Sequence, residues 1–160
     1  TERAKVIDPQ LVATVGRLNV KPNVPNVVAG EVEFSLDIRH HQETTIDDYC
    51  NEIFTEFKRF SETVNIEVAI SQWMDVKPVK MDVEMCEWAR EIAEEKNYRY
   101  QEIISGAGHD AQVFGPVCPT SLLFVPSQNG ISHSPNEFTS LEDLETGIDL
   151  LTELLYKLAY

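Results

Sequence analysis

The chain has 160 residues and carries 13 Lys and Arg against 27 Asp and Glu, so its formal net charge is −14. This acidity argues against a nucleic-acid partner, and no apolar run approaches the roughly 20 residues that cross a bilayer, so we expect no membrane partner either. The three cysteines fit neither a disulfide framework nor a Cys-x-x-Cys zinc site, and the N-terminus does not resemble a signal peptide, so we expect a cytoplasmic protein.

Two strands joined by a proline-containing loop are predicted near the start of the chain. Residues 12–20 show a moderate alternation of apolar and other side chains, and residues 31–39 alternate cleanly between an apolar and a polar face. Between them, Pro22 and Pro25 disfavour helical backbone and indicate a loop.

A helix and a further strand are predicted next. Thr45, with an acidic residue three positions on, predicts an N-cap, and the helix that follows runs to about Thr63 with an apolar stripe on one face. Residues 65–73 return to the alternation of a strand. Strands covered on one face by a helix predict a small α+β unit over residues 1–78.

The rest of the chain predicts helices separated by short strands. Residues 82–96 have the apolar spacing of a helix, residues 100–104 indicate a short strand, and residues 121–125 form an apolar run typical of a strand buried on both faces. Thr139-Ser-Leu-Glu142 predicts a capping box that opens a helix to Leu158. This pattern predicts α/β architecture, but with too few strands for an independent sheet, so we expect a piece of something larger.

A change of pattern at Pro78 divides the chain into a first segment, residues 1–78, and a second segment, residues 79–160. Both segments are acidic. The proline and the change of pattern, rather than the charge, therefore mark the boundary.

His109 lies in a glycine-rich loop, Ser105-Gly-Ala-Gly-His-Asp-Ala111. Glycines allow a backbone to approach a ligand closely, while His109 and Asp110 supply a titrating group and an acceptor. Loops at the carboxyl ends of strands are where α/β proteins build their sites. From spacing alone, a functional loop and an ordinary solvated turn stay equally open.

A second histidine, His133, follows the predicted strand at residues 121–125 and precedes the last helix. The serines beside it and Glu137 are placed to orient its imidazole, as the partners of metal-bound histidines do. One histidine cannot close a metal site by itself, so the residues alone slightly favour an ordinary polar loop.

Arg39 ends the polar face of the second predicted strand, and a guanidinium binds a carboxylate well through two parallel hydrogen bonds. Without further information, the simpler interpretation is that Arg39 is a surface arginine that balances the charges of Asp37 and Glu33. Asn26 is more readily a turn residue than a ligand contact. The sequence contains no nucleophile elbow, P-loop or dinucleotide-binding motif.

Five stretches, taken together and in order, favour functional roles for these residues over ordinary structural ones. They are Thr14-Val-Gly-Arg-Leu18, Pro22-Asn-Val-Pro-Asn-Val-Val-Ala-Gly30, Val32-Glu-Phe-Ser-Leu-Asp-Ile-Arg-His40, Ser105-Gly-Ala-Gly-His-Asp-Ala111 and Gly130-Ile-Ser-His-Ser-Pro-Asn-Glu-Phe138. The combination closely resembles the carboxyl-terminal part of the binuclear-metal amidohydrolases, a group that includes N-carbamoyl-L-amino-acid hydrolase, allantoate amidohydrolase and β-alanine synthase. Aminoacylases and dipeptidases are more distant relatives.

The resemblance implies an α/β, metallo-exopeptidase-like catalytic domain that is interrupted by a ferredoxin-like α+β lid, through which the protein forms a homodimer. Residues 1–78 then correspond to the later part of the lid/dimerisation domain. Residues 79–160 correspond to the C-terminal part of the catalytic domain, which explains the shortage of strands.

The resemblance also implies roles for individual residues. Asn26 and Arg39 match lid residues that bind the substrate, with Arg39 pairing with its carboxylate. Gly108 and His109 match the catalytic-domain loop that closes on the substrate, and His109 is the candidate catalytic residue.

His133 matches the last metal ligand of the family, and Asp110 and Glu137 are expected as supporting residues. The family binds two divalent ions, Zn, Mn, Co or Ni, which activate a bridging water and polarise the scissile carbonyl. The remaining ligands and the glutamate general base have no counterpart in this sequence. We therefore expect that this polypeptide alone neither holds two metals nor turns over substrate.

The implied activity is hydrolysis of linear amides in carboxylate-bearing small molecules, namely N-carbamoyl amino acids or ureido acids such as allantoate. An aminoacylase or dipeptidase is the alternative within the same family. An alternative from a different functional class is that the chain is a non-catalytic, ferredoxin-like dimerisation module.

Overall fold

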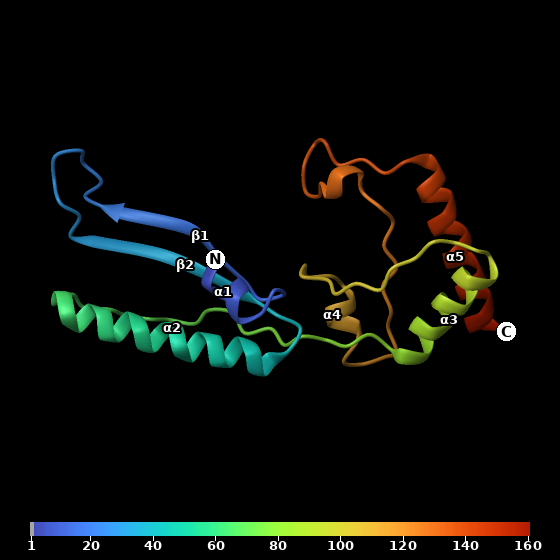
Figure 1. The fold of residues 1–160 in the computed structure, drawn as a ribbon, viewed down its shortest axis with the longest axis horizontal. Coiled ribbons are helices and arrows are strands. Elements are labelled where there is room, and N and C mark those ends of the chain that lie inside the picture. Colours follow the sequence, from blue (N-terminus) through green and yellow to red (C-terminus); the bar gives the residue numbers. More distant parts are fainter. Residues whose placement is uncertain (1) are drawn as a thin grey trace. The chain divides into compact units, whose positions relative to one another are not determined.

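The structure is a computed structural model, and it describes residues 2–160. The chain divides into two compact units, with Pro78 the last residue of the first and Val79 the first residue of the second. Figure 1 colours the first unit from blue to green and the second from green to red. Helices occur in both units, and the described residues form one two-stranded sheet, which confirms the α/β class predicted from the sequence.

An antiparallel hairpin forms the sheet of the first unit. β1 (Val12–Lys21) and β2 (Glu31–Arg39) occupy the residues predicted as the first two strands. They pair along their whole length, so the end of β2 lies beside the start of β1. The register shifts once, between Val15 and Arg17, and pairing continues on both sides of this irregularity.

A long helix, α2 (Glu43–Val64), packs against β2 and confirms the predicted helix. The rings of Phe34 in β2 and Phe57 in α2 meet edge to face, with centroids 5.8 Å apart. Such pairs stabilise packing beyond their buried area. The helix ends at Asn65, whose left-handed backbone (φ 53°) suits an asparagine.

The helix α2 begins earlier than the sequence predicts. Its N-cap is Gln42, which has extended backbone, whereas Thr45 lies inside the first turn. The predicted N-cap at Thr45 is therefore wrong. The backbone N–H of Gln42 donates to Nδ1 of the buried His40 at 3.1 Å, so the residue before the helix is held by a contact with a buried side chain that the sequence pattern does not show.

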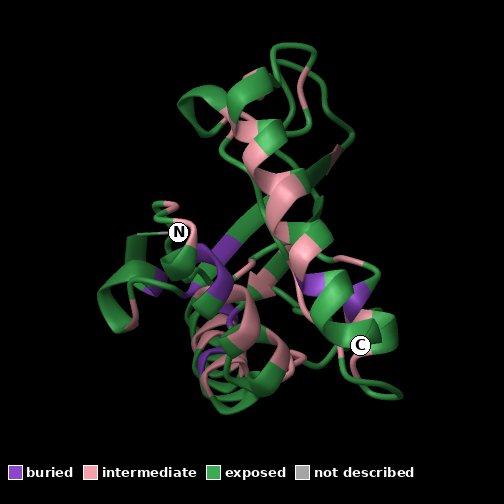
Figure 2. Cartoon of the chain, turned by 90° about the vertical axis from the view of Figure 1, so that its right-hand side faces the viewer, coloured by how far each residue is buried: buried purple, intermediate pink, exposed green. Residues whose placement is uncertain are grey.

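A short helix, α1 (Glu2–Ile7), precedes the hairpin and is not predicted by the sequence pattern. The guanidinium of Arg3 pairs with the carboxylates of Glu52 and Glu56 on α2. Buried residues are purple in Figure 2, and four of them form the small core of this unit, to which α1 contributes. Its members are Ala4, Leu11, Ala13 and Tyr49, each with no more than 4% of its surface exposed.

Residues 65–73 do not form the predicted strand. They lack regular secondary structure and have no ladder partner among the described residues. Ile66, Val68 and Ile70 keep between 38% and 61% of their surface exposed. An alternating pattern shows that a segment suits a sheet, but a strand also needs a neighbour to pair with its backbone groups.

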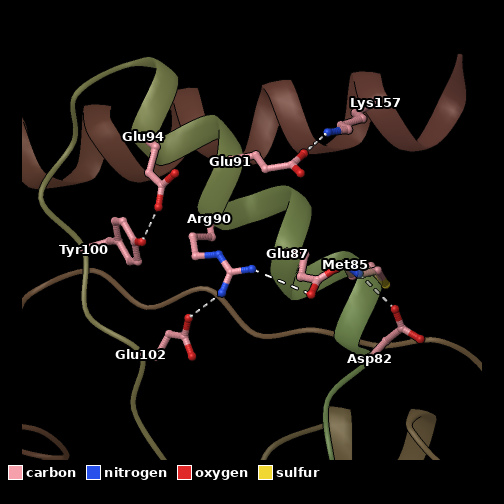
Figure 3. A network of polar contacts seen from close by, with 9 residues as sticks. All are labelled: Asp82, Met85, Glu87, Arg90, Glu91, Glu94, Tyr100, Glu102 and Lys157. Atoms are coloured by element: carbon pink, nitrogen blue, oxygen red, sulfur yellow. Dashed lines mark hydrogen bonds and ion pairs between the residues drawn. The ribbon is translucent and has the colours of Figure 1, made fainter.

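The second unit is built on helices. α3 (Val83–Glu95) confirms the helix predicted at residues 82–96, and the side chain of Asp82 caps it by accepting the N–H of Met85 at 2.9 Å, as Figure 3 shows. A single turn, α4 (Ala111–Phe114), follows later in the chain, and a 3₁₀ turn spans Gln128–Gly130.

The last helix, α5 (Leu141–Ala159), is also predicted, but its cap lies one residue later than expected. The cap is Ser140, whose hydroxyl accepts the N–H of Asp143 at 3.1 Å and donates to its carboxylate at 2.6 Å. The predicted box Thr139-Ser-Leu-Glu142 is therefore corrected by one position. Within the described residues, no helix combines the length and apolarity needed to span a membrane.

Neither residues 100–104 nor residues 121–125 form the predicted strands, because no partner strand exists for them in the described part of the chain. The second of these segments lies against α5 instead. A Cβ placed on Gly147 would lie 2.4 Å from Cγ1 of Val125. Glycine at this position therefore lets the apolar segment and the helix approach each other closely.

A cluster of charged and polar groups joins α3 to α5. Nζ of Lys96 lies 2.7 Å from a carboxylate oxygen of Asp149 and 2.8 Å from one of Glu153. The hydroxyl of Tyr98 donates to the same oxygen of Asp149 at 2.6 Å. The hydrogen bonds from Lys96 and Tyr98 hold the pKa of the Asp149 carboxyl below its usual range, and both acids raise the pKa of Lys96.

Further ion pairs surround α3 (Figure 3). Arg90 lies between two carboxylates, 3.7 Å from Glu87 and 3.5 Å from Glu102. On the other side of the helix, Lys157 of α5 lies 2.7 Å from Glu91. Both helices are rich in acids, so these cations offset repulsion between them.

We predict that the Asp149 contacts stabilise the second unit in a pH-dependent way. The folded pKa of Asp149 is depressed, so its contribution is present above the unfolded pKa of about 3.9 and is lost as the pH falls through the folded value. Asp149→Asn should lower the melting temperature at neutral pH and reduce the loss of stability on acidification. Circular dichroism melts across this pH range measure both effects.

The matched control is Glu145→Gln, which removes an exposed carboxylate of α5 that has no ion-pair partner among the described residues. Equal melting curves for the Asp149 and Glu145 variants would contradict the prediction.

Candidate functional site

Arg39 occupies the last position of β2, on the polar face of the strand. Its Nε donates to Oδ1 of Asp37 at 2.7 Å, and its Nη2 donates to Oδ2 of the same carboxylate at 3.0 Å. These hydrogen bonds hold the pKa of the Asp37 carboxyl below its usual value and raise the pKa of Arg39. The guanidinium is therefore charged and oriented by a neighbour on the same strand.

The residue after Arg39 is anchored inside the first unit. The side chain of His40 is fully buried, and its Nε2 lies 3.5 Å from a carboxylate oxygen of Asp8. Nε2 has no hydrogen-bond partner among the described residues, so this contact is a close approach rather than a full hydrogen bond. The anchor holds the end of β2 beside the segment that follows α1.

Asn26 lies in the exposed loop that joins β1 to β2, at the end of the hairpin opposite to the one where Arg39 lies (Figure 1). β2 has 9 residues, so at about 3.3 Å per residue its two ends lie roughly 26 Å apart. The structure therefore does not bring Asn26 and Arg39 of one chain together.

In the second unit, the imidazole of His109 has two close neighbours. Oγ of Ser105 lies 2.8 Å from Nε2 of His109, and the ring of Phe124 meets the imidazole edge to face, with centroids 5.4 Å apart. The Ser105 hydroxyl also accepts the backbone N–H of Ala107 at 3.2 Å. His109 is therefore partly buried and oriented, not a freely solvated side chain.

Gly106, Gly108 and Asp110 of the same loop are exposed. A Cβ at Gly106 would meet nothing within 4 Å, and one at Gly108 would make only an ordinary contact, 3.5 Å from the side chain of Gln112. Internal packing therefore does not account for these glycines. Asp110 lies at the start of α4, where its carbonyl accepts backbone N–H groups of the helix and its side chain makes no capping hydrogen bond.

His133 is exposed and has left-handed backbone, with φ at 54°. For residues other than glycine this conformation costs roughly 1–2 kcal/mol. The carboxylate of Glu137 accepts the backbone N–H of His133 at 2.8 Å, so its contact is with the backbone of the turn rather than with the imidazole. Residues held in such conformations cluster at functional sites.

The described residues do not form a metal centre by themselves. No group of three or more His, Cys, Asp or Glu side chains among residues 2–160 is arranged to hold an ion. His133 offers a single imidazole, whereas zinc sites use three or four protein ligands. The two divalent ions implied by the family resemblance therefore do not fit the residues of this chain alone.

One of two contacts at the candidate site can be predicted from the sequence, and the other cannot. Asp37 and Arg39 lie on the same face of an alternating strand, so the pattern predicts that they are neighbours, although it does not distinguish a substrate-binding arginine from one that only balances a nearby charge. Ser105 and His109 lie in an irregular loop, where no periodicity indicates which side chains meet. The role of Ser105 beside His109 is therefore visible only in the structure.

A comparison with protein families and individual proteins gives a consistent result. The model of peptidase family M20/M25/M40 matches residues 4–157. The allantoate amidohydrolase of Bacillus subtilis (strain 168) is 40% identical over 158 residues, which cover 99% of this chain and 38% of that protein. The allantoate amidohydrolase of Escherichia coli (strain K12) is 38% identical over 159 residues, which cover 99% of this chain and 39% of that protein. The chain thus spans less than two fifths of these relatives.

Solved structures show the same partial coverage. An amidase of the hydantoinase/carbamoylase family from Burkholderia multivorans matches with a TM-score of 0.89 and 35% identity, over 96% of this chain and 38% of that chain. AtUAH in complex with glyoxylate matches with a TM-score of 0.85 and 24% identity, over 98% of this chain and 38% of that chain. The second likeness concerns the fold alone.

Proposed function

The chain belongs to peptidase family M20/M25/M40, and from this premise we propose that it is part of a metal-dependent hydrolase that cleaves linear amides of N-carbamoyl amino acids or ureido acids such as allantoate. The observation that carries the proposal is the similarity, over 99% of the chain, to two enzymes named allantoate amidohydrolase. Because the chain spans only 38% and 39% of those enzymes, the activity is proposed for the longer protein.

In this proposal, residues 1–78 belong to a lid/dimerisation domain and residues 79–160 to a catalytic domain. The segments with strand patterns but no partner pair with strands from elsewhere in the longer protein. Exposed apolar side chains support this idea, because Ile103, Ile104 and Phe124 keep 58%, 52% and 48% of their surface in contact with solvent. Covering them with neighbouring strands would remove apolar surface from water.

Arg39 is the proposed reader of the substrate carboxylate. Its guanidinium is charged, half-exposed and oriented by Asp37, and the planar, five-donor guanidinium is the side chain best suited to bind a carboxylate. Gly108 and His109 form the loop that contacts the substrate, and Asp110 supports that loop.

A homodimer formed through the first unit would allow Asn26 and Arg39 to contact the same substrate. The two residues lie at opposite ends of one hairpin, too far apart to touch the same small molecule. In the proposed dimer, Asn26 of one copy reaches the site that contains Arg39 of the other.

The proposed enzyme uses two divalent ions, Zn, Mn, Co or Ni, with His133 as one ligand and the others from parts of the longer protein outside this chain. The strained, exposed position of His133 supports this role. Cys50, Cys86 and Cys118 are free thiols, which supports a reducing, cytoplasmic location.

A substrate panel tests the proposal directly. The complete protein would be assayed with N-carbamoyl amino acids, allantoate, N-acyl amino acids and dipeptides, each with added Mn²⁺, Co²⁺, Ni²⁺ or Zn²⁺. Turnover of a carbamoyl or ureido acid supports the proposal. Preference for acyl amino acids or dipeptides favours the aminoacylase or dipeptidase alternative, and a lack of turnover throughout favours the dimerisation module.

We predict that Arg39→Ala in the complete protein raises KM for carboxylate-bearing substrates roughly 10- to 100-fold, the loss expected when charge-assisted hydrogen bonds are removed. Steady-state kinetics measure the effect. Arg59→Ala, which removes an exposed arginine of α2, is the matched control and should keep the original KM. An unchanged KM for Arg39→Ala would remove Arg39 from the site.

We predict complementation between Asn26→Ala and Arg39→Ala. In a hybrid dimer of the two variants, one site receives both intact residues and the other receives neither, so activity at low substrate should exceed that of either variant alone. Co-expression with two affinity tags isolates the hybrid. If both residues of one copy served the same site, every site of the hybrid would be defective and no gain would appear.

We predict that His133→Asn lowers the metal content of the complete protein without lowering the melting temperature of its metal-free form. Asparagine tolerates left-handed backbone but lacks the imidazole. Elemental analysis of purified protein measures the bound metal. His41→Asn, a change of an exposed histidine in the first unit, is the control. Equal metal content in both variants would show that His133 is not a ligand.

A further inference from the structure

The hydroxyl of Ser105 has three polar neighbours, and their distances constrain where its single proton lies. The backbone N–H of Ala107 donates to Oγ at 3.2 Å, which uses a lone pair. Two further contacts involve Oγ: Nε2 of His109 at 2.8 Å, which accepts the proton or donates its own according to the tautomer of the ring, and the carbonyl of Ala107 at 3.3 Å, which only accepts. The shorter contact has the better hydrogen-bond distance for a hydroxyl donor.

A hydroxyl that donates to Nε2 determines the tautomer of the imidazole. A neutral histidine carries one N–H, so a ring that accepts at Nε2 carries its proton on Nδ1. The ring is also restricted on a second side, because Phe124 meets it edge to face at 5.4 Å. The structure gives Nδ1 of His109 no hydrogen-bond partner among residues 2–160.

We propose that Ser105 is a positioning residue for His109, which it holds as the Nδ1–H tautomer so that the imidazole donates a hydrogen bond to an oxygen of the bound substrate. The inference rests on the proposed function, since it assumes that His109 contacts substrate. It assigns His109 the role of a hydrogen-bond donor to a carbonyl or carboxylate oxygen and not that of a proton acceptor at Nδ1.

A competing role for Ser105 is purely structural, because its hydroxyl also closes the turn at Ala107. The two roles differ in whether Ser105 acts through the imidazole. A double-mutant cycle between Ser105 and His109 separates them.

The kinetic test uses the complete protein with its metals and a carbamoyl or ureido acid that it turns over. Ser105→Ala should raise KM roughly threefold to tenfold with a smaller change in kcat, the loss expected for one neutral hydrogen bond. Ser105→Thr keeps the hydroxyl and should restore KM. In a His109→Ala background, Ser105→Ala should have no further effect. An equal effect of Ser105→Ala in both backgrounds, or no rescue by threonine, would overturn the proposal.

A spectroscopic test does not depend on activity. Nitrogen-15 NMR of the imidazole, with His109→Gln to assign its signals, distinguishes the two neutral tautomers of His109. We expect Nδ1–H in the parent protein and a shift towards a mixture in Ser105→Ala. An Nε2–H tautomer in the parent would overturn the inference. If the expected tautomer is found but no amide substrate is turned over, the proposed function fails and the positioning role of Ser105 stands.

Discussion

Backbone pairing decides which parts of this chain become sheet. β1 and β2 are joined by a single loop, residues 22–30, and each strand provides the partner of the other. Residues 65–73 and 121–125 have the side-chain patterns of strands, yet they have no partner among the described residues and stay irregular. Their apolar side chains consequently remain partly exposed, which is the expected state of a strand-like segment without a partner.

Two of the candidate functional side chains, those of Arg39 and His109, each contact a residue close to them in the sequence, and the backbone of a third residue, His133, is held by a local contact. Asp37 orients Arg39, Ser105 contacts the ring of His109, and Glu137 supports the backbone of His133. Local contacts of this kind pre-organise a group before distant parts of a protein assemble around it. The proposed enzyme therefore needs the longer protein to gather these groups and to complete the metal site, but not to orient Arg39 and His109.

The sequence indicates the residues of the site better than it indicates their arrangement. The motifs around Arg39, His109 and His133 are recognisable from residue order, and the match to a known family agrees with that recognition. The separation of Asn26 from Arg39 follows from the predicted hairpin, because Asn26 precedes the second strand and Arg39 ends it. In contrast, the sequence gives no indication that the Ser105 hydroxyl meets the imidazole of His109.

For the fold, the sequence alone determined the elements whose signals are local. The strands at residues 12–20 and 31–39 and the helices at 82–96 and 141–158 follow from side-chain period and capping residues within a few positions. Only the tertiary structure decided that α2 starts after Gln42, beside the buried His40, and that three strand-like segments stay unpaired. The reason is that helix periodicity is satisfied within one segment, whereas burial and strand pairing depend on residues that are distant in the sequence.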